Sequence, residues 1–173
     1  MKRAFLVLGA ESTGTRLVTR LLISSGCAGD GDHVQRWDSE TPVGPLVVWR
    51  RSIPHDKVWP DIGAMIDFLR AQSYDVGAVV TVRDWTAAVP SQVAIGHVSD
   101  EATALRQTRA AYPFIFAALL RHGIPYVIAI YESMVRRPEA VGRLLDMLGL
   151  PRVQHEEILD GNEKWFKEPE GSE

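Results

Sequence analysis

The sequence predicts an α/β fold with three layers, in which a mostly parallel sheet of about four strands is flanked by helices. Two observations carry this prediction. Short apolar runs alternate with longer segments in which apolar residues recur at helical spacing. The loop after each of the first three runs is polar and contains glycine or arginine. We expect a single domain over residues 1–168, followed by a frayed tail at 169–173.

The first predicted unit is a strand, a loop and a helix within residues 3–26. The run 4–8 is apolar throughout, which is typical of a strand buried in a parallel sheet. Apolar residues then recur at helical spacing from Leu17 to Leu22, and Gly26 is predicted to end the helix.

The remaining elements follow the same alternation along the chain. Further strands are predicted at residues 46–49, 76–82 and 125–131. Helices are predicted at 61–72 with Asp61 as N-cap, from about residue 101 to 122 with Pro113 kinking or dividing the helix, and from Pro138 to about residue 148.

The composition excludes several classes of protein. Lys and Arg number 19 against 22 Asp and Glu, so the net charge of −3 provides no basic field for nucleic acid. Cys27 is the only cysteine, which excludes an internal disulfide and favours a reducing, cytoplasmic location. No apolar run approaches the roughly 20 residues of a membrane span, and the first run stops at Glu11, so we interpret it as a core strand. The oligomeric state is not determined by these numbers.

The loop from Gly9 to Arg16 has the features of an anion site. It has little side-chain bulk and leads into a helix, whose first backbone N–H groups have no partner within the helix. A glycine lets the backbone approach a phosphate closely, while hydroxyl groups and one arginine add donors. The candidate ligand-binding residues of this loop are Ser12, Thr13, Gly14, Thr15 and Arg16.

The same loop differs from the nucleoside-triphosphate P-loop, G-x-x-x-x-G-K-[ST]. Gly9 and Gly14 have the required separation, but Thr15 and Arg16 stand where the lysine and the magnesium-binding hydroxyl are expected. This difference predicts an anionic nucleotide that is bound without a metal ion. The alternative is a strand-turn-helix of another α/β fold, in which the glycines serve only the turn.

Charged segments are predicted after three successive strands, at residues 9–16, 50–55 and 83–91. Ligands of open α/β sheets bind beyond the carboxyl ends of the strands, so these segments are expected to face one crevice. A ligand with two phosphate groups fits two such turns. The alternative for Arg50 and Arg51 is a solvated pair, and the polar loop 27–45 is either functional or a disordered connection.

Three stretches resemble the sulfotransferase family that uses 3′-phosphoadenosine 5′-phosphosulfate (PAPS). Residues 12–15, Ser-Thr-Gly-Thr, are similar to the 5′-phosphosulfate loop, commonly [KR]-[ST]-G-T. Arg83 and Ser91, eight residues apart, are similar to the 3′-phosphate motif. Residues 131–151 are similar to the segment Y-E-D-L…P…L-L-x-F-L-G-L-P.

The resemblance implies a P-loop-like α/β fold and transfer of a sulfuryl group from PAPS to a hydroxyl or amine of a small-molecule or carbohydrate acceptor, leaving the bisphosphate PAP. It implies that residues 12–16 hold the 5′-phosphosulfate and that Arg83 and Ser91 hold the 3′-phosphate. Lys164 is a further candidate, as a basic C-terminal loop covers this phosphate in some members. No metal is expected.

The sequence departs from the family pattern in two ways. Ser12 replaces the usual basic residue, and the candidate substitutes are Arg16, which is the nearest, and Arg50 or Arg51. The histidine that takes the acceptor proton in many members is also displaced. The candidate bases, in order, are His55, His33 and Glu11.

Two other functions stay open at this stage. A non-catalytic nucleotide- or anion-binding protein of the same fold is favoured by Ser12 and by the short acceptor side, for which only residues 27–45 and 101–122 are available. A P-loop kinase of a small metabolite ranks lower, because it requires the missing lysine and hydroxyl.

Overall fold

The computed structural model describes residues 1–34, 43–55, 57–153 and 158–166. Within them lies one parallel sheet with the strand order β2-β1-β3-β4. The predicted α/β class and the parallel sheet of four strands are confirmed. The strands are β1 (Lys2–Ala10), β2 (Leu46–Ile53), β3 (Tyr74–Val82) and β4 (Tyr126–Ile130).

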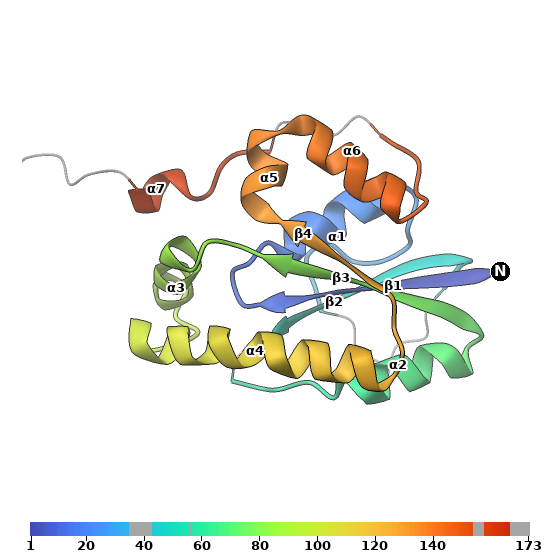
Figure 1. Ribbon diagram of the computed structural model, residues 1–173, viewed down its shortest axis with the longest axis horizontal. Coiled ribbons are helices and arrows are strands. Elements are labelled where there is room, and N and C mark those ends of the chain that lie inside the picture. The colour runs from blue at the N-terminus through green and yellow to red at the C-terminus, as the bar shows by residue number, and fades with distance from the viewer. Residues whose placement is uncertain (35–42, 56, 154–157, 167–173) are drawn as a thin grey trace, which may run out of the picture.

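Helices cover both faces of the sheet, which confirms the three layers (Figure 1). Helices α1, α5 and α6 lie on one face, while α2 and α4 lie on the other. Helix α3 lies beyond the arrowheads of the strands, beside α4. The helices are α1 (Thr15–Ser24), α2 (Ile62–Ala71), α3 (Trp85–Ala94), α4 (Glu101–Arg121), α5 (Tyr131–Arg136), α6 (Pro138–Met147) and α7 (Glu163–Phe166).

Strand β1 is buried on both faces because it lies inside the sheet and both layers of helices cover it. Alternate side chains of the strand point to opposite faces. Leu6 and Leu8 belong to the core shared with α2 and α4. Phe5 and Val7 belong to the core shared with α1 and α6. This double burial explains why the strand reads as one continuous apolar run rather than as an alternating pattern.

The capping and stop residues act as the sequence indicates. The side chain of Asp61 accepts a hydrogen bond from the backbone N–H of Ala64 at 2.9 Å, which caps α2. Asp100 caps α4 in the same way through Thr103 at 2.7 Å. Pro138 is the first residue of α6, where its missing N–H costs nothing.

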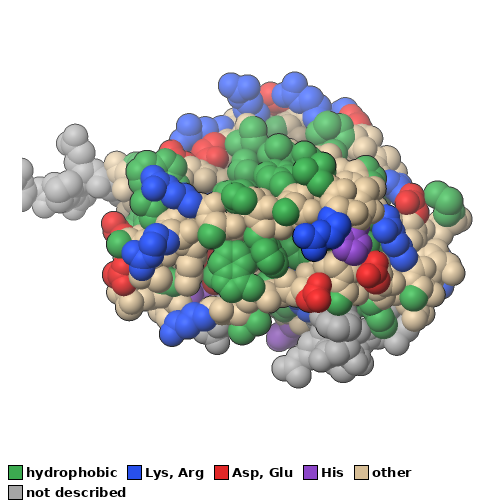
Figure 2. Space-filling view, turned by 60° about the horizontal axis from the view of Figure 1, so that its bottom comes forward, with side chains coloured by type: hydrophobic (Ala, Val, Ile, Leu, Met, Phe, Trp, Pro, Cys, Tyr) green, Lys and Arg blue, Asp and Glu red, His purple; other side chains and the backbone are tan. Residues whose placement is uncertain are grey.

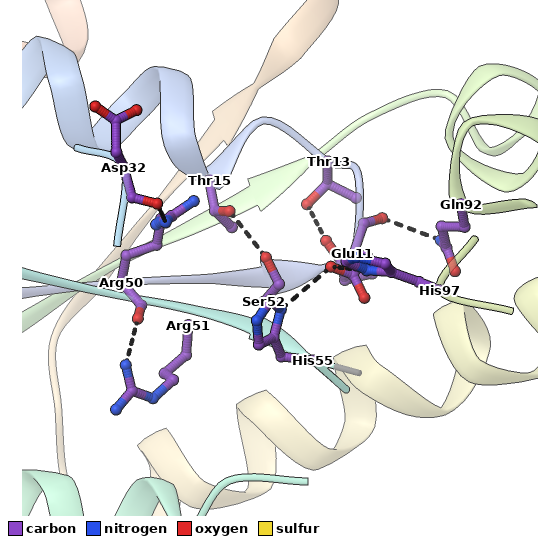
Figure 3. Close-up of polar contacts among 11 residues, drawn as sticks. Glu11, Thr13, Thr15, Asp32, Arg50, Arg51, Ser52, His55, Gln92 and His97 are labelled. Carbon is purple, nitrogen blue, oxygen red and sulfur yellow. Dashed lines mark hydrogen bonds and ion pairs between the residues drawn. The ribbon is translucent and has the colours of Figure 1, made fainter. Parts of the chain in front are cut away.

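Strand β2 is longer than predicted, and this corrects the placement of the basic segment after it. Arg50, Arg51 and Ser52 continue the strand in register with β1, and all three are buried. The prediction of a basic turn over residues 50–55 is therefore wrong for its first four residues. The two arginines point to opposite faces of the sheet, so they cannot act as one cationic pair (Figure 3).

Three further boundaries differ from the prediction. Tyr131 begins helix α5 instead of ending the fourth strand. The sequence predicts that Pro90 and Ser91 lie near a helix start, but they lie in the second half of α3, because Asp84 caps that helix through Thr86. Helix α4 continues through Pro113 and is not divided. The predicted frayed tail lies outside the described residues.

The strand order determines which loops meet. Strand β1 lies between β2 and β3, and all three run in the same direction. The segments that follow them therefore emerge side by side at one end of the sheet, as the sequence predicts. None of the described helices is both long and apolar enough to cross a lipid bilayer.

Gly9, in the part of β1 next to the loop, lets the side chains of Thr81 and Thr13 pack closely against the backbone of β1. A Cβ atom there would overlap the hydroxyl of Thr81 and lie 2.6 Å from Thr13 Oγ1. We expect Gly9→Ala to lower the free energy of unfolding by about 1–3 kcal/mol, because overpacking a rigid core forces its neighbours apart. Urea denaturation measures this change.

Gly77, in β3, is the matched control. A Cβ atom at Gly77 would have its nearest neighbours at 3.8 Å, which is ordinary contact. Gly77→Ala should leave the stability unchanged or raise it by up to about 1 kcal/mol, because alanine reduces the entropy of the unfolded chain. Equal losses in the two variants would show that close packing at Gly9 is not the cause.

Candidate functional site

The loop between β1 and α1 has an uncommon backbone conformation at two of its residues. Ser12 has φ of 63° and Gly14 has φ of 94°, so both lie in the left-handed region. Gly14 is also the N-cap of α1, and no side chain of the described residues caps that helix end. The N–H groups of the first helical turn are therefore available to an anion, at the positive end of the helix dipole.

The threonines of this loop point inward and hold it in place. The Thr13 hydroxyl donates to the Ala10 carbonyl at 2.6 Å, and its oxygen lies 2.8 Å from Thr81 Oγ1. The hydroxyl of Thr15 lies 3.1 Å from Ser52 Oγ. Thr13 and Thr15 are both buried. We therefore expect Thr15 to contact a ligand through its backbone N–H rather than its hydroxyl, whereas the Thr13 N–H already donates to the Ala10 carbonyl at 3.3 Å.

Two cations lie close to the loop on the α1 side of the sheet. Arg16 is exposed in the first turn of α1, and Arg50 projects from β2 toward the same side. Burial lowers the pKa of Arg50, and the neighbouring charge of Arg16 lowers it further. Arg50 donates to the Asp32 carbonyl at 2.9 Å (Figure 3). Arg51 lies on the other face, where it donates to the Arg50 carbonyl.

Arg83, directly after β3, links the loop to the C-terminal part of the chain. Its Nη1 donates to the Ser12 carbonyl at 2.9 Å, and its Nη2 donates to the Gly161 carbonyl at 3.0 Å. Its Nε donates to Asn162 Oδ1 at 2.6 Å. The guanidinium also stacks on the Tyr131 ring, 4.5 Å from the centroid. Arg83 thus joins three segments that are far apart in the sequence.

Tyr131 and Glu132 complete this connection, and the sequence analysis assigned them no role. The Tyr131 hydroxyl accepts a hydrogen bond from the Gly161 N–H at 2.8 Å, and its ring lies against Gly14, where a Cβ atom would be 2.9 Å away. Glu132 Oε1 accepts from Asn162 Nδ2 at 2.8 Å and from the Asp84 N–H at 3.0 Å. Their position directly after an apolar strand was the available signal.

A second polar cluster lies where β1 and β2 end. Glu11 is buried, and its Oε1 lies 3.4 Å from His55 Nδ1 and 2.8 Å from His97 Nδ1 (Figure 3). Gln92 of α3 supports the cluster by donating to the Glu11 carbonyl at 3.0 Å and to Thr108 Oγ1 at 2.9 Å. The structure thus brings together two of the three predicted bases, His55 and Glu11. His97 was not singled out because nothing in its local sequence marks it.

Three other candidates lie apart from these clusters. His33 is 84% exposed and pairs with Asp30 at 2.9 Å. Ser91 makes no hydrogen bond with Arg83, although the structure describes both residues. Lys164 is exposed on α7, where its ammonium lies over the Trp165 ring at 4.7 Å.

A cavity of about 450 Å³ lies between β3, β4 and α4, next to Arg83. Its lining is mostly apolar and aromatic, with Arg109 as a second cation. Tyr112 lines this cavity, and its hydroxyl donates to the Thr81 carbonyl at 3.3 Å. Burial raises the pKa of Tyr112 to about 12. Hydrophobic side chains also gather on the outer surface, among Lys and Arg side chains (Figure 2).

Comparisons with known proteins support the fold. No family model matches the chain, and no curated protein matches it. Among solved structures, the chain is similar to the sulfotransferase domain of the olefin synthase from Synechococcus PCC 7002. The TM-score is 0.58 and the sequence identity is 14%, and the match covers 98% of this chain and 80% of that domain. The chain therefore has the fold of a sulfotransferase domain.

Asn162 is expected to hold the C-terminal segment against Arg83. It is buried and bonds to two charged side chains, so Asn162→Ala removes one of the hydrogen bonds that Arg83 and Glu132 each make. We expect a loss of about 1.5–3 kcal/mol in unfolding free energy and faster proteolysis after residue 153. Glu163→Ala, at an exposed position, is the control. Identical cleavage rates in the two variants would contradict this role.

Proposed function

We propose that this protein is a sulfotransferase that moves a sulfuryl group from PAPS to a hydroxyl or amine of a small-molecule or carbohydrate acceptor. The observation that carries the proposal is the loop of residues 11–14 with its uncapped helix end, flanked by Arg16 and Arg83, on the fold of a sulfotransferase domain. A small dianion at a helix N-terminus and a second phosphate near a separate arginine match the two anionic groups of PAPS.

The residues present fit the donor. The 5′-phosphosulfate would be held by the backbone N–H groups from Gly14 to Arg16, because no side chain of the described residues caps this helix end, whereas the Thr13 N–H donates to the Ala10 carbonyl at 3.3 Å. The 3′-phosphate would be held by Arg83, which keeps one N–H on each terminal nitrogen beyond its bonds to Ser12 and Gly161. Ser91 and Lys164 are further candidates for that phosphate, once the ligand orders the surrounding side chains.

The chemistry of the proposed site requires positioning and charge stabilisation more than covalent catalysis. PAPS supplies a sulfuryl group that is activated by its bond to a phosphate oxygen. The acceptor oxygen or nitrogen forms its bond to sulfur as that bond breaks. Arg16 and the N–H groups of the α1 terminus stabilise the negative charge that develops on the departing phosphate. Arg16 thereby replaces the basic residue that the sequence lacks at Ser12.

We assign His55 as the base that removes the proton from the acceptor. Its Nδ1 faces Glu11 Oε1, which orients the ring and leaves Nε2 to accept the proton. The side chain is 45% exposed, so an acceptor can reach it. The acceptor itself would enter from the side of α4. The apolar cavity lined by that helix suits the hydrocarbon part of an acceptor.

The alternative functions are weighed by the same geometry. The P-loop kinase loses support because Thr15, at the position of the phosphate-binding lysine, is buried and shares its hydroxyl with Ser52. A protein that binds the nucleotide without catalysis is favoured by Ser12, because this residue supplies no positive charge to the leaving phosphate. Its carbonyl accepts a hydrogen bond from Arg83. Turnover measurements separate this alternative from the proposed enzyme.

Ligand-dependent thermal unfolding tests the nucleotide. Adenosine 3′,5′-bisphosphate at 100 times its dissociation constant should stabilise the protein by about 2.7 kcal/mol, which corresponds to several degrees. 5′-AMP and ATP-Mg should shift the transition much less, since they lack the 3′-phosphate. A shift with ATP-Mg alone would support the kinase, and no shift with any of the three would contradict the proposed ligand.

Arg16→Ala tests the role of the cation in catalysis. We expect turnover to fall more than affinity for the bisphosphate, because Arg16 acts mainly on charge that develops in the transition state. Arg20→Ala is the matched control, since Arg20 lies one turn further along α1 and pairs with Asp32. Equal turnover in the two variants would assign the catalytic charge to another residue.

His55→Gln tests the proposed base. Removal of a general base costs about 10²- to 10⁴-fold in turnover, while the bisphosphate should still bind with its original affinity. His33→Gln provides the comparison, because His33 is exposed and pairs with Asp30 outside the cluster. If His33→Gln lost the activity and His55→Gln retained it, the assignment of the base would be overturned.

A further inference from the structure

Three potential metal ligands converge at the end of the sheet, from three separate segments. Glu11 follows β1, His55 follows β2, and His97 lies in the connection between α3 and α4. One ligand atom of each residue lies within 4.8 Å of those of the other two. In Figure 3, His55 and His97 both lie beside the Glu11 side chain. A metal ion at this point would connect all three segments.

The burial of these groups makes the cluster more than an exposed ion pair. The Glu11 side chain is 10% exposed, whereas the side chains of His55 and His97 are 45% and 31% exposed. A buried carboxylate requires a cationic partner or several hydrogen bonds. Imidazole rings can meet this requirement by donating N–H groups to the carboxylate, or by binding a cation that they share with it.

The nitrogen of His97 that faces Glu11 provides an independent observation. His97 Nδ1 is buried and lies 2.8 Å from Glu11 Oε1, yet it makes no hydrogen bond with any described group. A hydrogen on this nitrogen would therefore not point at the carboxylate oxygen. The nitrogen is directed beside that oxygen, as it would be if both atoms faced a common ion rather than each other.

The spacing of the ligand atoms fits a tetrahedral ion. Zinc binds histidine nitrogen at about 2.0–2.1 Å and carboxylate oxygen at about 2.0–2.2 Å, which places neighbouring tetrahedral ligands about 3.3 Å apart. Glu11 Oε1 lies 3.4 Å from His55 Nδ1 and 2.8 Å from His97 Nδ1. The cluster as a whole lies within 4.8 Å, which is the spacing of ligand atoms around one ion before it binds.

We infer that Glu11, His55 and His97 form a binding site for a divalent transition-metal ion of the Zn²⁺ class, with a fourth position open to water. Two imidazoles and one carboxylate are ligands that zinc uses in proteins. This site departs from the metal-free expectation drawn from the sequence, because His97 gave no local signal. It requires neither PAPS binding nor sulfuryl transfer.

Metal binding and base catalysis would compete for His55. The ion takes the lone pair of Nδ1, which leaves the proton on Nε2 and removes the base. If the proposed function holds, Zn²⁺ should therefore inhibit turnover while the bisphosphate still binds.

Calorimetric titration of the metal-stripped full-length protein with ZnCl₂ tests the site. We expect binding of one equivalent and a higher unfolding temperature with zinc, reversed by a chelator. His97→Ala should lose both effects. Co²⁺ titration gives a second readout, since tetrahedral Co²⁺ absorbs visible light far more strongly than octahedral, water-bound Co²⁺.

His122→Ala is the matched control. His122 Nδ1 also faces a carboxylate, at 3.4 Å from Asp67, but among the described residues no third potential ligand joins that pair. This variant should keep the one equivalent of zinc. If His97→Ala fails to fold, His55→Ala provides the same readouts from the more exposed ring.

Two results would overturn the inference: no zinc bound by the unmodified protein, or zinc bound equally by the unmodified protein, His55→Ala and His97→Ala. Either result would identify the cluster as an ion pair alone. The bisphosphate shift is measured in separate samples without metal, so failure of the zinc site and failure of the proposed function are distinguishable.

Discussion

The left-handed backbone at Ser12 and Gly14 is the constraint on which the rest of this structure depends. A non-glycine residue in this region costs of order 1–3 kcal/mol, so the turn persists only because its neighbours hold it. Thr13 anchors it from inside, Thr15 anchors it to β2, and Arg83 anchors the Ser12 carbonyl from β3. The loop is therefore held in place before any ligand arrives, and its N–H groups do not need to reorganise around an anion.

The same contacts explain why the end of the chain belongs to the site. Arg83 and Tyr131 hold Gly161, and Asn162 joins Arg83 to Glu132. The tyrosine and glutamate that resemble a sulfotransferase motif therefore have a structural role here. They pack against the loop and bind the C-terminal segment beside it. Changes in that segment can act on the loop through Arg83, without touching a ligand.

The cluster of Glu11, His55 and His97 gives one set of side chains two possible chemical uses. As an oriented base, His55 needs Nδ1 for its contact with Glu11. As a metal ligand, it needs the same nitrogen for the ion. The two uses exclude each other, because one lone pair cannot serve both. The relative amounts of protons and metal ions would therefore decide which state is populated.

The sequence by itself determined the α/β class, the approximate position of each strand, and the glycine loop. Buried parallel strands are continuous apolar runs, and a loop of small residues directly after such a run stands out from it. It also placed Arg16, Arg83, His55 and Glu11 at one end of the sheet, because segments that follow parallel strands emerge at the same end. Only the tertiary structure decided that Arg50 and Arg51 continue a strand, that Tyr131 and Asn162 meet Arg83, and that His97 reaches Glu11. These contacts join residues that are far apart in the sequence and follow no regular spacing, so no local sequence pattern indicates them.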